Sequence, residues 1–274
     1  MSKKDIQQKN GLGCLPAKKD IRDFKLNKKI SLSCQYPTHF ECEHRSKIKN
    51  QGIVGSCVAH SVAEILEYHD NMSEELSTNF LYGIHYKLFG SEGPGMYLRE
   101  ACKIAKDYGN PAYKYCPGNY EVKKVYSTAE EAFEKEETLN SAAQHRISKY
   151  VKLSTFNELK YALMEYGPVL ASINWYDDNK VDKKTGLITK GTIDAGGHAI
   201  VILGWDENGW LAQNSWGISW GKKGYFTIPY DYKITEAYSL VIDTDKTKND
   251  IQQPAKCGLT NIFYKVINWV INLF

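Results

Sequence analysis

The sequence predicts an α+β fold in which a helical first half precedes a strand-rich second half, with a cleft between two subdomains. Two stretches with helical spacing of apolar residues lie in the first half, at residues 57–66 and 98–105. Beyond residue 168 the pattern changes to short apolar runs separated by turn residues, which is typical of antiparallel strands. A chain of 274 residues is long enough to bury a core in each half.

The chain divides into three parts by composition. Residues 1–36 are polar and rich in Lys without a sustained hydrophobic period, and we interpret them as an arm or strap. Residues 37–245 carry the helical and strand patterns and form the folded domain. Residues 246–274 are predicted to be a linker followed by an amphipathic C-terminal helix at 259–274.

In the first half, a helix is predicted to begin at Cys57, because apolar residues recur at helical spacing after it and glycines stand just before it. A second helix spans about residues 96–108 and is stopped by Gly109. The acidic stretch from Ala129 to Glu137 is interpreted as a solvated helix face or crossover without chemistry of its own.

The second half opens with a short amphipathic helix at 156–166, which Gly167 and Pro168 end. The apolar run 169–173 then predicts a buried strand. A strand beginning at His198, a turn at residues 206–209 and a returning strand at 210–216 together predict a hairpin. Residues 224–228 predict one more strand.

Composition narrows the class of protein. With 42% hydrophobic, 24% charged and 12% aromatic residues, the chain is neither disordered nor fibrous. The net charge of +3 is spread without a dense basic run, so nucleic acid is not an expected partner. The N-terminus has no apolar segment of signal-peptide length, and we expect an intracellular, cytoplasmic protein.

The cysteines form neither a disulfide framework nor a zinc ribbon, because there are seven of them at irregular spacing. We interpret them as free thiols, some buried as small apolar residues. Cys34, Cys42 and His44 could hold a metal ion, but no second pair of ligands with recognisable spacing accompanies them, so no metal is predicted.

Cys57 is the candidate nucleophile. A thiol reacts as thiolate, and a helix N-terminus with a nearby imidazolium lowers its pKa from about 8.5 into a usable range. Taken alone, a Cys at the start of a helix is more often a buried small hydrophobe.

Three other residues give Cys57 a catalytic context. Gln51 lies six positions upstream, where its amide could serve as an oxyanion donor. His198 lies 141 positions downstream, within the range of about 130–150 found for papain-type Cys and His pairs. Asn214 follows 16 positions later, and the predicted hairpin would bring its side chain beside the imidazole to fix the ring orientation. For His198 or Asn214 alone, a role in the core or in a turn is the simpler interpretation.

Three motifs in this order, QGIVGSCVAHS, GGHAIVILGW and QNSWGISWGKKGYF, resemble the active-site segments of papain-like cysteine peptidases, the cathepsin family. The resemblance covers about residues 37–243 and implies the papain-like two-subdomain fold with the active site in the cleft. It implies Cys57 as nucleophile, His198 as general acid and base, Asn214 as its orienter and Gln51 as oxyanion donor. Trp216 would cover the hydrogen bond between His198 and Asn214.

The resemblance also extends to substrate binding and to the N-terminal arm. The Gly-rich stretch SEGPGMYL corresponds to a subsite of the family, with Gly93, Gly95 and Met96 as candidate substrate-binding residues. The text GLGCLPAKKDIRDF resembles segments preceding the catalytic domain in compact members, which makes a zymogen with an inhibitory pro-like segment an expectation. Val54 and Val58 depart from the family, because many members have a bridge-forming Cys and an aromatic residue there. The missing bridge agrees with a reducing compartment.

The implied function is hydrolysis of protein or peptide substrates through a Cys57 thioester, favouring endopeptidase action because no His-His occluding loop is present, and it requires no cofactor. An acyltransferase using the same residues and a non-catalytic peptidase-like binding module are the alternatives. The tail 259–274, at 16 residues, is short for a membrane span of about 20. It could pack on its own domain, lie on a membrane surface as a peripheral anchor or dock on a partner. The sequence does not fix the oligomeric state.

Overall fold

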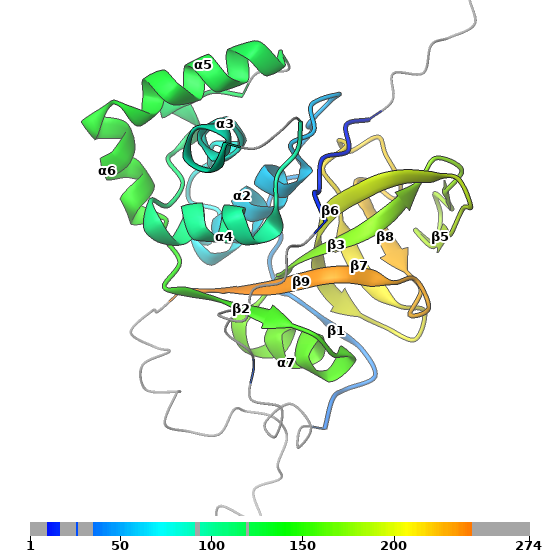
Figure 1. Ribbon diagram of the computed structural model, residues 1–274. Helices are drawn as coiled ribbons and strands as arrows, with labels where there is room; N and C mark the ends of the chain where they lie inside the picture. Colours follow the sequence, from blue (N-terminus) through cyan, green and yellow to red (C-terminus); the bar gives the residue numbers. More distant parts are fainter. Residues whose placement is uncertain (1–9, 17–25, 27–34, 91–93, 119–120, 243–274) are drawn as a thin grey trace, which may run out of the picture.

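The structure is a computed structural model that describes residues 10–16, 26, 35–90, 94–118 and 121–242. The predicted tail helix at 259–274 lies outside the described residues, as do Cys34 and Cys257. Helices α2 to α6 gather on one side and the sheet lies on the other (Figure 1). The predicted order of a helical half followed by a strand-rich half is therefore confirmed.

Three helices, α2, α4 and α7, lie at the predicted positions, whereas α3 was not predicted. The helices are α2 (Cys57–His69), α3 (Thr78–Phe89), α4 (Leu98–Asp107), α5 (Val122–Phe133), α6 (Glu136–Gln144), α7 (Phe156–Tyr166) and a short 3-10 helix at Tyr113–Tyr115. The acidic stretch forms the end of α5 and the start of α6 rather than one helix face, with a break at residues 134–135. Its small residues are not solvated: a Cβ atom added to Gly83 of α3 would lie 2.1 Å from the Cβ of Ala129, so α3 and α5 pack in close contact.

Helix α7 shows how local sequence sets a boundary. The Thr155 hydroxyl accepts a hydrogen bond from the backbone amide of Glu158, and the Glu158 carboxylate accepts one from the backbone amide of Thr155. This reciprocal pair is a capping box. At the other end the chain continues through Gly167 at φ +85°, a conformation that L side chains rarely adopt. These two signals delimit the helix predicted at 156–166.

Seven strands form one antiparallel sheet. Six of them follow the order β2-β9-β3-β6-β7-β8, and β1 pairs with β6. Their bounds are β1 (Phe40–Glu41), β2 (Lys149–Leu153), β3 (Val169–Tyr176), β6 (Asp194–Trp205), β7 (Trp210–Gln213), β8 (Tyr225–Ile228) and β9 (Ile234–Val241). A separate two-stranded ribbon joins β4 (Lys180–Val181) to β5 (Ile188–Thr189).

The predicted hairpin is formed by β6 and β7, which pair Trp205 with Trp210 across the turn. One detail of the prediction is wrong: β6 begins at Asp194, four residues before His198. Gly196 and Gly197 can lie inside the strand because β3 continues to Tyr176 and supplies partners for this extension. His198 is therefore held within a paired strand rather than at its free beginning.

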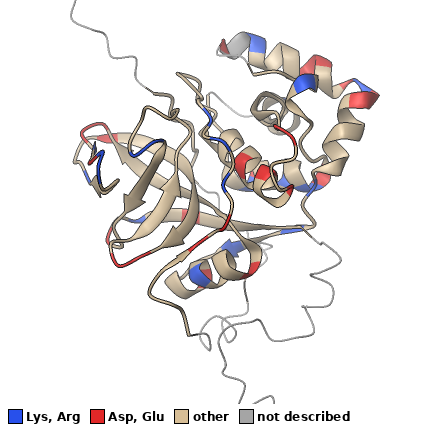
Figure 2. Ribbon diagram, turned by 180° about the vertical axis from the view of Figure 1, so that it is seen from behind, with Lys and Arg blue, Asp and Glu red and all other residues tan. Residues whose placement is uncertain are grey.

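The two faces of the sheet bury two separate cores. One core joins Cys57 and the apolar residues of α2 to the sheet face that carries Ala199 and Val201. The other fills the opposite face and includes the apolar side of α7. Basic and acidic residues are interspersed over both layers in the view from behind (Figure 2). Within the described ranges, no helix is both long and apolar enough to cross a membrane.

Candidate active site

The first residue of α2 is Cys57, which has no exposed surface. Its Sγ accepts hydrogen bonds from backbone amides of two distant segments, Ala199 on β6 at 3.4 Å and Gly13 in the N-terminal arm. The position at a helix N-terminus provides further unpaired N–H groups around the sulfur. The thiol thus lies where the helical and strand-rich layers meet, as the sequence predicts.

The imidazole of His198 is one residue from the amide that binds the Cys57 sulfur. Its Nε2 lies 2.8 Å from Oδ1 of Asn214, which follows directly after β7. An amide oxygen can only accept, so Nε2 carries the proton and Nδ1 is left as the basic nitrogen. No other described group hydrogen-bonds to Nδ1. Asn214 therefore orients the ring and fixes a tautomer that leaves Nδ1 able to act as a base, although no hydrogen bond joins Nδ1 to the Cys57 sulfur in this closed state.

Aromatic rings close the site from the solvent side. Trp216 stacks on His198 with centroids 4.4 Å apart and planes 26° apart. Trp175 meets both rings edge-on, at 5.5 Å from His198 and 4.7 Å from Trp216. Trp216 therefore covers the ring of His198, and Trp175, which the motifs did not single out, contacts both rings.

Gln51 is tied to the same network by both ends of its amide. Its Nε2 donates to the Val54 carbonyl at 2.8 Å, and its Oε1 accepts the Ser215 hydroxyl at 2.6 Å. The backbone amide of Ser215 in turn donates to Oδ1 of Asn214 at 2.8 Å. Ser215 therefore joins the candidate oxyanion donor to the candidate triad, a role not assigned from the sequence although the residue stands inside QNSWG.

Residues 10–16 of the N-terminal arm, here called the strap, cross this site. On one side of Cys57 the Gly11 amide donates to the Gly52 carbonyl at 2.9 Å. On the other side, the Met96 amide donates to the Gly13 carbonyl at 2.8 Å and the Leu15 amide donates to the Met96 carbonyl at 3.0 Å. The strap is an extended chain bound on both sides of the nucleophile.

The strap also forms hydrogen bonds with residues of the candidate site. Gln51 Nε2 donates to the Gly11 carbonyl at 2.9 Å, and Gly197 accepts the Cys14 amide at 3.1 Å. The group that the strap presents to the Cys57 sulfur is the N–H of Gly13, not a carbonyl. The carbonyl that Gln51 binds is that of Gly11, whereas the amide at the sulfur belongs to the peptide bond between Leu12 and Gly13.

Burial determines the protonation states of Cys57 and His198 beneath the strap. It raises the pKa of the Cys57 thiol to about 11, although backbone hydrogen bonds from Ala199 and Gly13 act in the opposite direction. Burial also lowers the pKa of His198 to about 4, against a smaller opposing effect of Asn214. At neutral pH the covered site therefore holds a neutral thiol and a neutral imidazole rather than the reactive ion pair.

Three of the four predicted substrate-binding residues lie among the described residues. Gly95 donates its amide to the Tyr82 hydroxyl at 3.2 Å, and the backbone of Met96 binds the strap. Trp216 lies over His198. Gly93 lies outside the described residues.

The remaining cysteines give no metal centre within the described ranges, where no three His, Cys, Asp or Glu side chains are grouped to hold an ion. Cys42 is packed in the second core, and burial raises the pKa of its thiol to about 12. Like Cys14, Cys57 and Cys116, it is a free thiol. Cys34 is not among the described residues, so the alternative of a metal ion held with Cys42 and His44 lies outside the described part of the chain.

Comparison with known proteins agrees with this architecture. Residues 36–242 match the family model described as papain family cysteine protease. The chain therefore belongs to the papain family of cysteine proteases.

Among curated proteins, the chain is 28% identical over 208 residues to the uncharacterized peptidase C1-like protein L477 of Acanthamoeba polyphaga mimivirus, covering 68% of this chain and 65% of that protein. It is 29% identical over 220 residues to cathepsin B-like cysteine proteinase 3 of Caenorhabditis elegans, covering 69% of this chain and 58% of that protein. The matches thus span about three fifths of the length of these relatives.

Among solved structures, xylellain, a cysteine protease from Xylella fastidiosa, superimposes with a TM-score of 0.70 at 23% identity, covering 86% of this chain and 98% of that one. The structure of procathepsin B S9 from Trypanosoma congolense gives a TM-score of 0.65 at 17% identity, covering 85% and 87%. These likenesses establish the papain-like fold.

Proposed function

We propose that the protein is a cysteine endopeptidase whose cleft is closed by its own strap. The observation that carries the proposal is the strap itself, because its extended chain lies across Cys57 with hydrogen-bonded residues on both sides. A site that holds polypeptide on both sides of the nucleophile suits cleavage within a chain rather than trimming of its ends. The family membership supports the hydrolase class.

In this mechanism the Cys57 thiol passes its proton to Nδ1 of His198, the resulting thiolate attacks a peptide carbonyl carbon, and the C=O electron pair moves onto oxygen. The Cys57 N–H and the Gln51 amide hold that oxyanion, and removal of one such donor typically costs about 10²–10³-fold in kcat. The C–N bond then breaks as His198 gives its proton to the departing amine. A water molecule, which loses a proton to the same imidazole, hydrolyses the thioester and releases the acid and Cys57.

The test separates hydrolysis from its alternatives with one nucleophile variant and one donor variant. After removal of the strap, Cys57→Ala should lose both turnover and labelling by a thiol-directed peptidyl epoxide, whereas Gln51→Ala should keep labelling and turn over slowly. Intact masses of the products with an added amine distinguish hydrolysis from acyl transfer. Epoxide labelling that persists in Cys57→Ala, or products that carry the amine in place of water, would contradict the proposal.

The inhibitory role of the strap has its own readout. A chain lacking residues 1–16 should cleave peptides within their length, while the full chain should be slow until the strap is displaced. Equal rates of the full and truncated chains would show that the strap does not restrain the site. Release of single terminal residues only would overturn the endopeptidase assignment and leave the peptidase assignment intact.

A further inference from the structure

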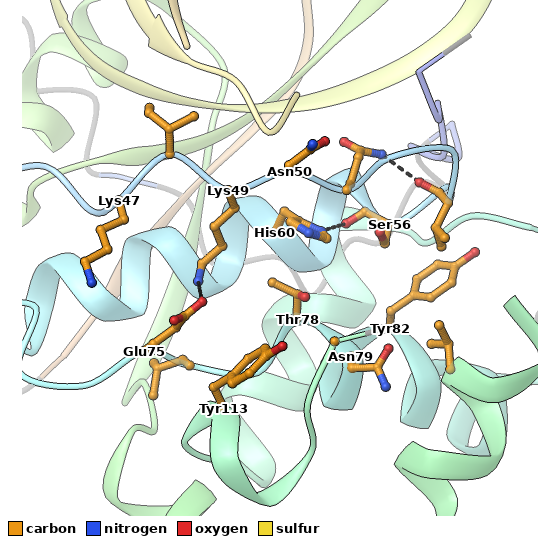
Figure 3. A pocket seen from close by; sticks show the side chains of 16 residues that line it. Lys47, Lys49, Asn50, Ser56, His60, Glu75, Thr78, Asn79, Tyr82 and Tyr113 are labelled. Carbon is orange, nitrogen blue, oxygen red and sulfur yellow. Dashed lines mark hydrogen bonds and ion pairs between the residues drawn. The ribbon is translucent and has the colours of Figure 1, made fainter. Parts of the chain in front are cut away.

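Helix α2 begins without a side-chain cap. Ser56 is its N-cap residue, and the Ser56 hydroxyl makes no capping hydrogen bond. Instead, the Ser56 carbonyl accepts two hydrogen bonds from His60, one from the backbone amide at 3.0 Å and one from ring Nδ1 at 2.9 Å. Figure 3 shows the imidazole turned toward Ser56 with this contact dashed. Both acceptor positions of that carbonyl are therefore used.

The Ser56 carbonyl and the Cys57 N–H belong to one planar peptide unit. Fixing the direction of the carbonyl therefore fixes the direction of the N–H, which is the backbone donor of the proposed oxyanion hole. A hydrogen bond to a carbonyl also polarises the whole amide and strengthens its N–H as a donor, by about 10–30% in condensed-phase estimates. The contact between His60 and Ser56 can thus influence the oxyanion without touching substrate.

The ring of His60 is held in the form that this contact requires. It is buried, and burial lowers its pKa to about 4, with a further lowering from the charge of Lys49. A neutral imidazole has one N–H, and because a carbonyl faces Nδ1, the proton resides there. Nε2 is then an acceptor. His60 lines a cavity of about 280 Å³ together with Lys49, Thr78 and Asn79 (Figure 3).

We propose that His60 is a positioning residue of the oxyanion hole, which acts by holding the peptide plane between Ser56 and Cys57. The inference deepens the proposed peptidase function and rests on it. It is distinct from the role of Gln51, because His60 orients the backbone donor and Gln51 supplies the side-chain donor. A merely structural His60 would affect folding but not the balance between oxyanion-dependent and oxyanion-independent reactions.

The decisive variants are His60→Asn and His60→Leu, which have nearly the same shape. The Asn amide nitrogen can take the place of Nδ1 and donate to the Ser56 carbonyl, whereas Leu cannot. His69→Leu is the control, because it removes a second imidazole from the same helix about 18 Å from Cys57. All three changes are made both in the full chain and in the chain lacking residues 1–16.

In the truncated chain, His60→Leu should lower kcat about tenfold, less than the 10²–10³-fold of losing a donor outright, with KM changed by less than about twofold. The affinity for a peptide aldehyde, whose oxygen occupies the oxyanion hole once Cys57 adds to it, should fall by a similar factor. Labelling by the epoxide does not use that hole and should keep its rate. His60→Asn should restore most of kcat and of the aldehyde affinity.

A second readout needs no turnover and is made on the full chain. With ¹⁵N-labelled cysteine, seven amide cross-peaks are expected, and the Cys57 peak is assigned by its loss in Cys57→Ser. His60→Leu should move the Cys57 peak, His60→Asn should return it toward its original place, and His69→Leu should leave it unchanged. An unmoved Cys57 peak in His60→Leu refutes the positioning role, even if the wild-type chain hydrolyses nothing and the proposed function fails.

The kinetic results are equally decisive. Equal losses in His60→Leu and His60→Asn, or a parallel loss of epoxide labelling, would assign His60 to packing of the helix.

Discussion

Gly13→Ala should release the active site without any cleavage of the chain. Gly13 of the strap lies so close to the loop before α2 that an added Cβ would be 1.9 Å from the Gly55 carbonyl oxygen. That atom belongs to the backbone, so it cannot move aside as a flexible side chain could. One methyl group therefore makes the bound position of the strap impossible, while the enzyme's own residues are untouched.

The size of the effect follows from the thiol. With a pKa of about 11, about 10⁻⁴ of Cys57 is thiolate at neutral pH, whereas the ordinary value of 9.0 corresponds to about 10⁻². The hundredfold gain in thiolate is offset in part, because a less basic thiolate is less nucleophilic by a factor of about eight over the same range. We expect alkylation by iodoacetamide to accelerate about tenfold from protonation alone, and more from access.

The assay is the rate of Cys57 carbamidomethylation at neutral pH, followed by peptide mapping so that the other thiols do not contribute. Gly118→Ala is the matched control, because its added Cβ would meet only the Tyr113 ring at an ordinary 3.5 Å. A folded Gly13→Ala protein that alkylates at the wild-type rate would refute the reasoning. It would mean that the strap does not govern the protonation of the nucleophile.

Three further predictions concern residues around the site. Burial raises the pKa of Glu64 from 4.5 to about 8, so the folded state favours the protonated carboxyl group. The stability that this group contributes is fully present below about pH 4.5 and is lost as the pH rises toward about 8. At 1.36 kcal/mol per pH unit, the loss in the free energy of unfolding is at most about 5 kcal/mol. Glu64→Gln should remove this slope in urea unfolding measured across that window, and an unchanged slope would contradict the assignment. Ser215→Ala leaves Gln51 Oε1 buried without its hydrogen-bond donor, which should cost about 1–3 kcal/mol in the free energy of unfolding. The same change should lower kcat more than the rate of epoxide labelling. Equal losses in both reactions would exclude a role at the oxyanion. The charge of Glu236 acts on the Cys14 thiol of the strap, although Glu236 also pairs with Lys152 Nζ at 3.5 Å and accepts the Tyr238 hydroxyl at 2.8 Å. A basic substrate side chain in the place of Cys14 would therefore gain from this partly neutralised carboxylate. Glu236→Gln should reduce cleavage of peptides with Lys or Arg there relative to Leu, and an unaltered ratio in a peptide library would disprove it.

Much of the catalytic geometry could be predicted from sequence because each residue of the site stands on a locally encoded element. The glycines and apolar spacing set the start of α2 at Cys57, and the turn at residues 206–209 sets the hairpin that brings Asn214 to His198. The exact start of β6 could not be predicted, since it depends on pairing with β3, which lies about 20 residues earlier in the sequence. Local signals do not record such pairing.

The contacts of the strap and the polar residues of α2 were not predicted, for another reason. The strap has no period of its own, and its conformation comes from hydrogen bonds to segments such as Gly52 and Met96 that are distant in sequence. His60 and Glu64 did leave a signal: they stand four residues apart within an otherwise apolar helical pattern, and both are buried. A polar pair on a buried helix face indicates a requirement beyond packing, because unpaired polar groups are costly to bury.

The strap also stands in for the oxyanion that it excludes. The amide of Gln51 donates both to the Val54 carbonyl, inside its own loop, and to the Gly11 carbonyl of the strap. When the strap leaves, the bond to Val54 and the bond from Ser215 remain, so the amide keeps its place while the second acceptor is vacated. A developing oxyanion can take that acceptor position without rearrangement of the loop. If Gln51 is the oxyanion donor that we propose, opening the site requires loss of the strap rather than construction of the oxyanion hole.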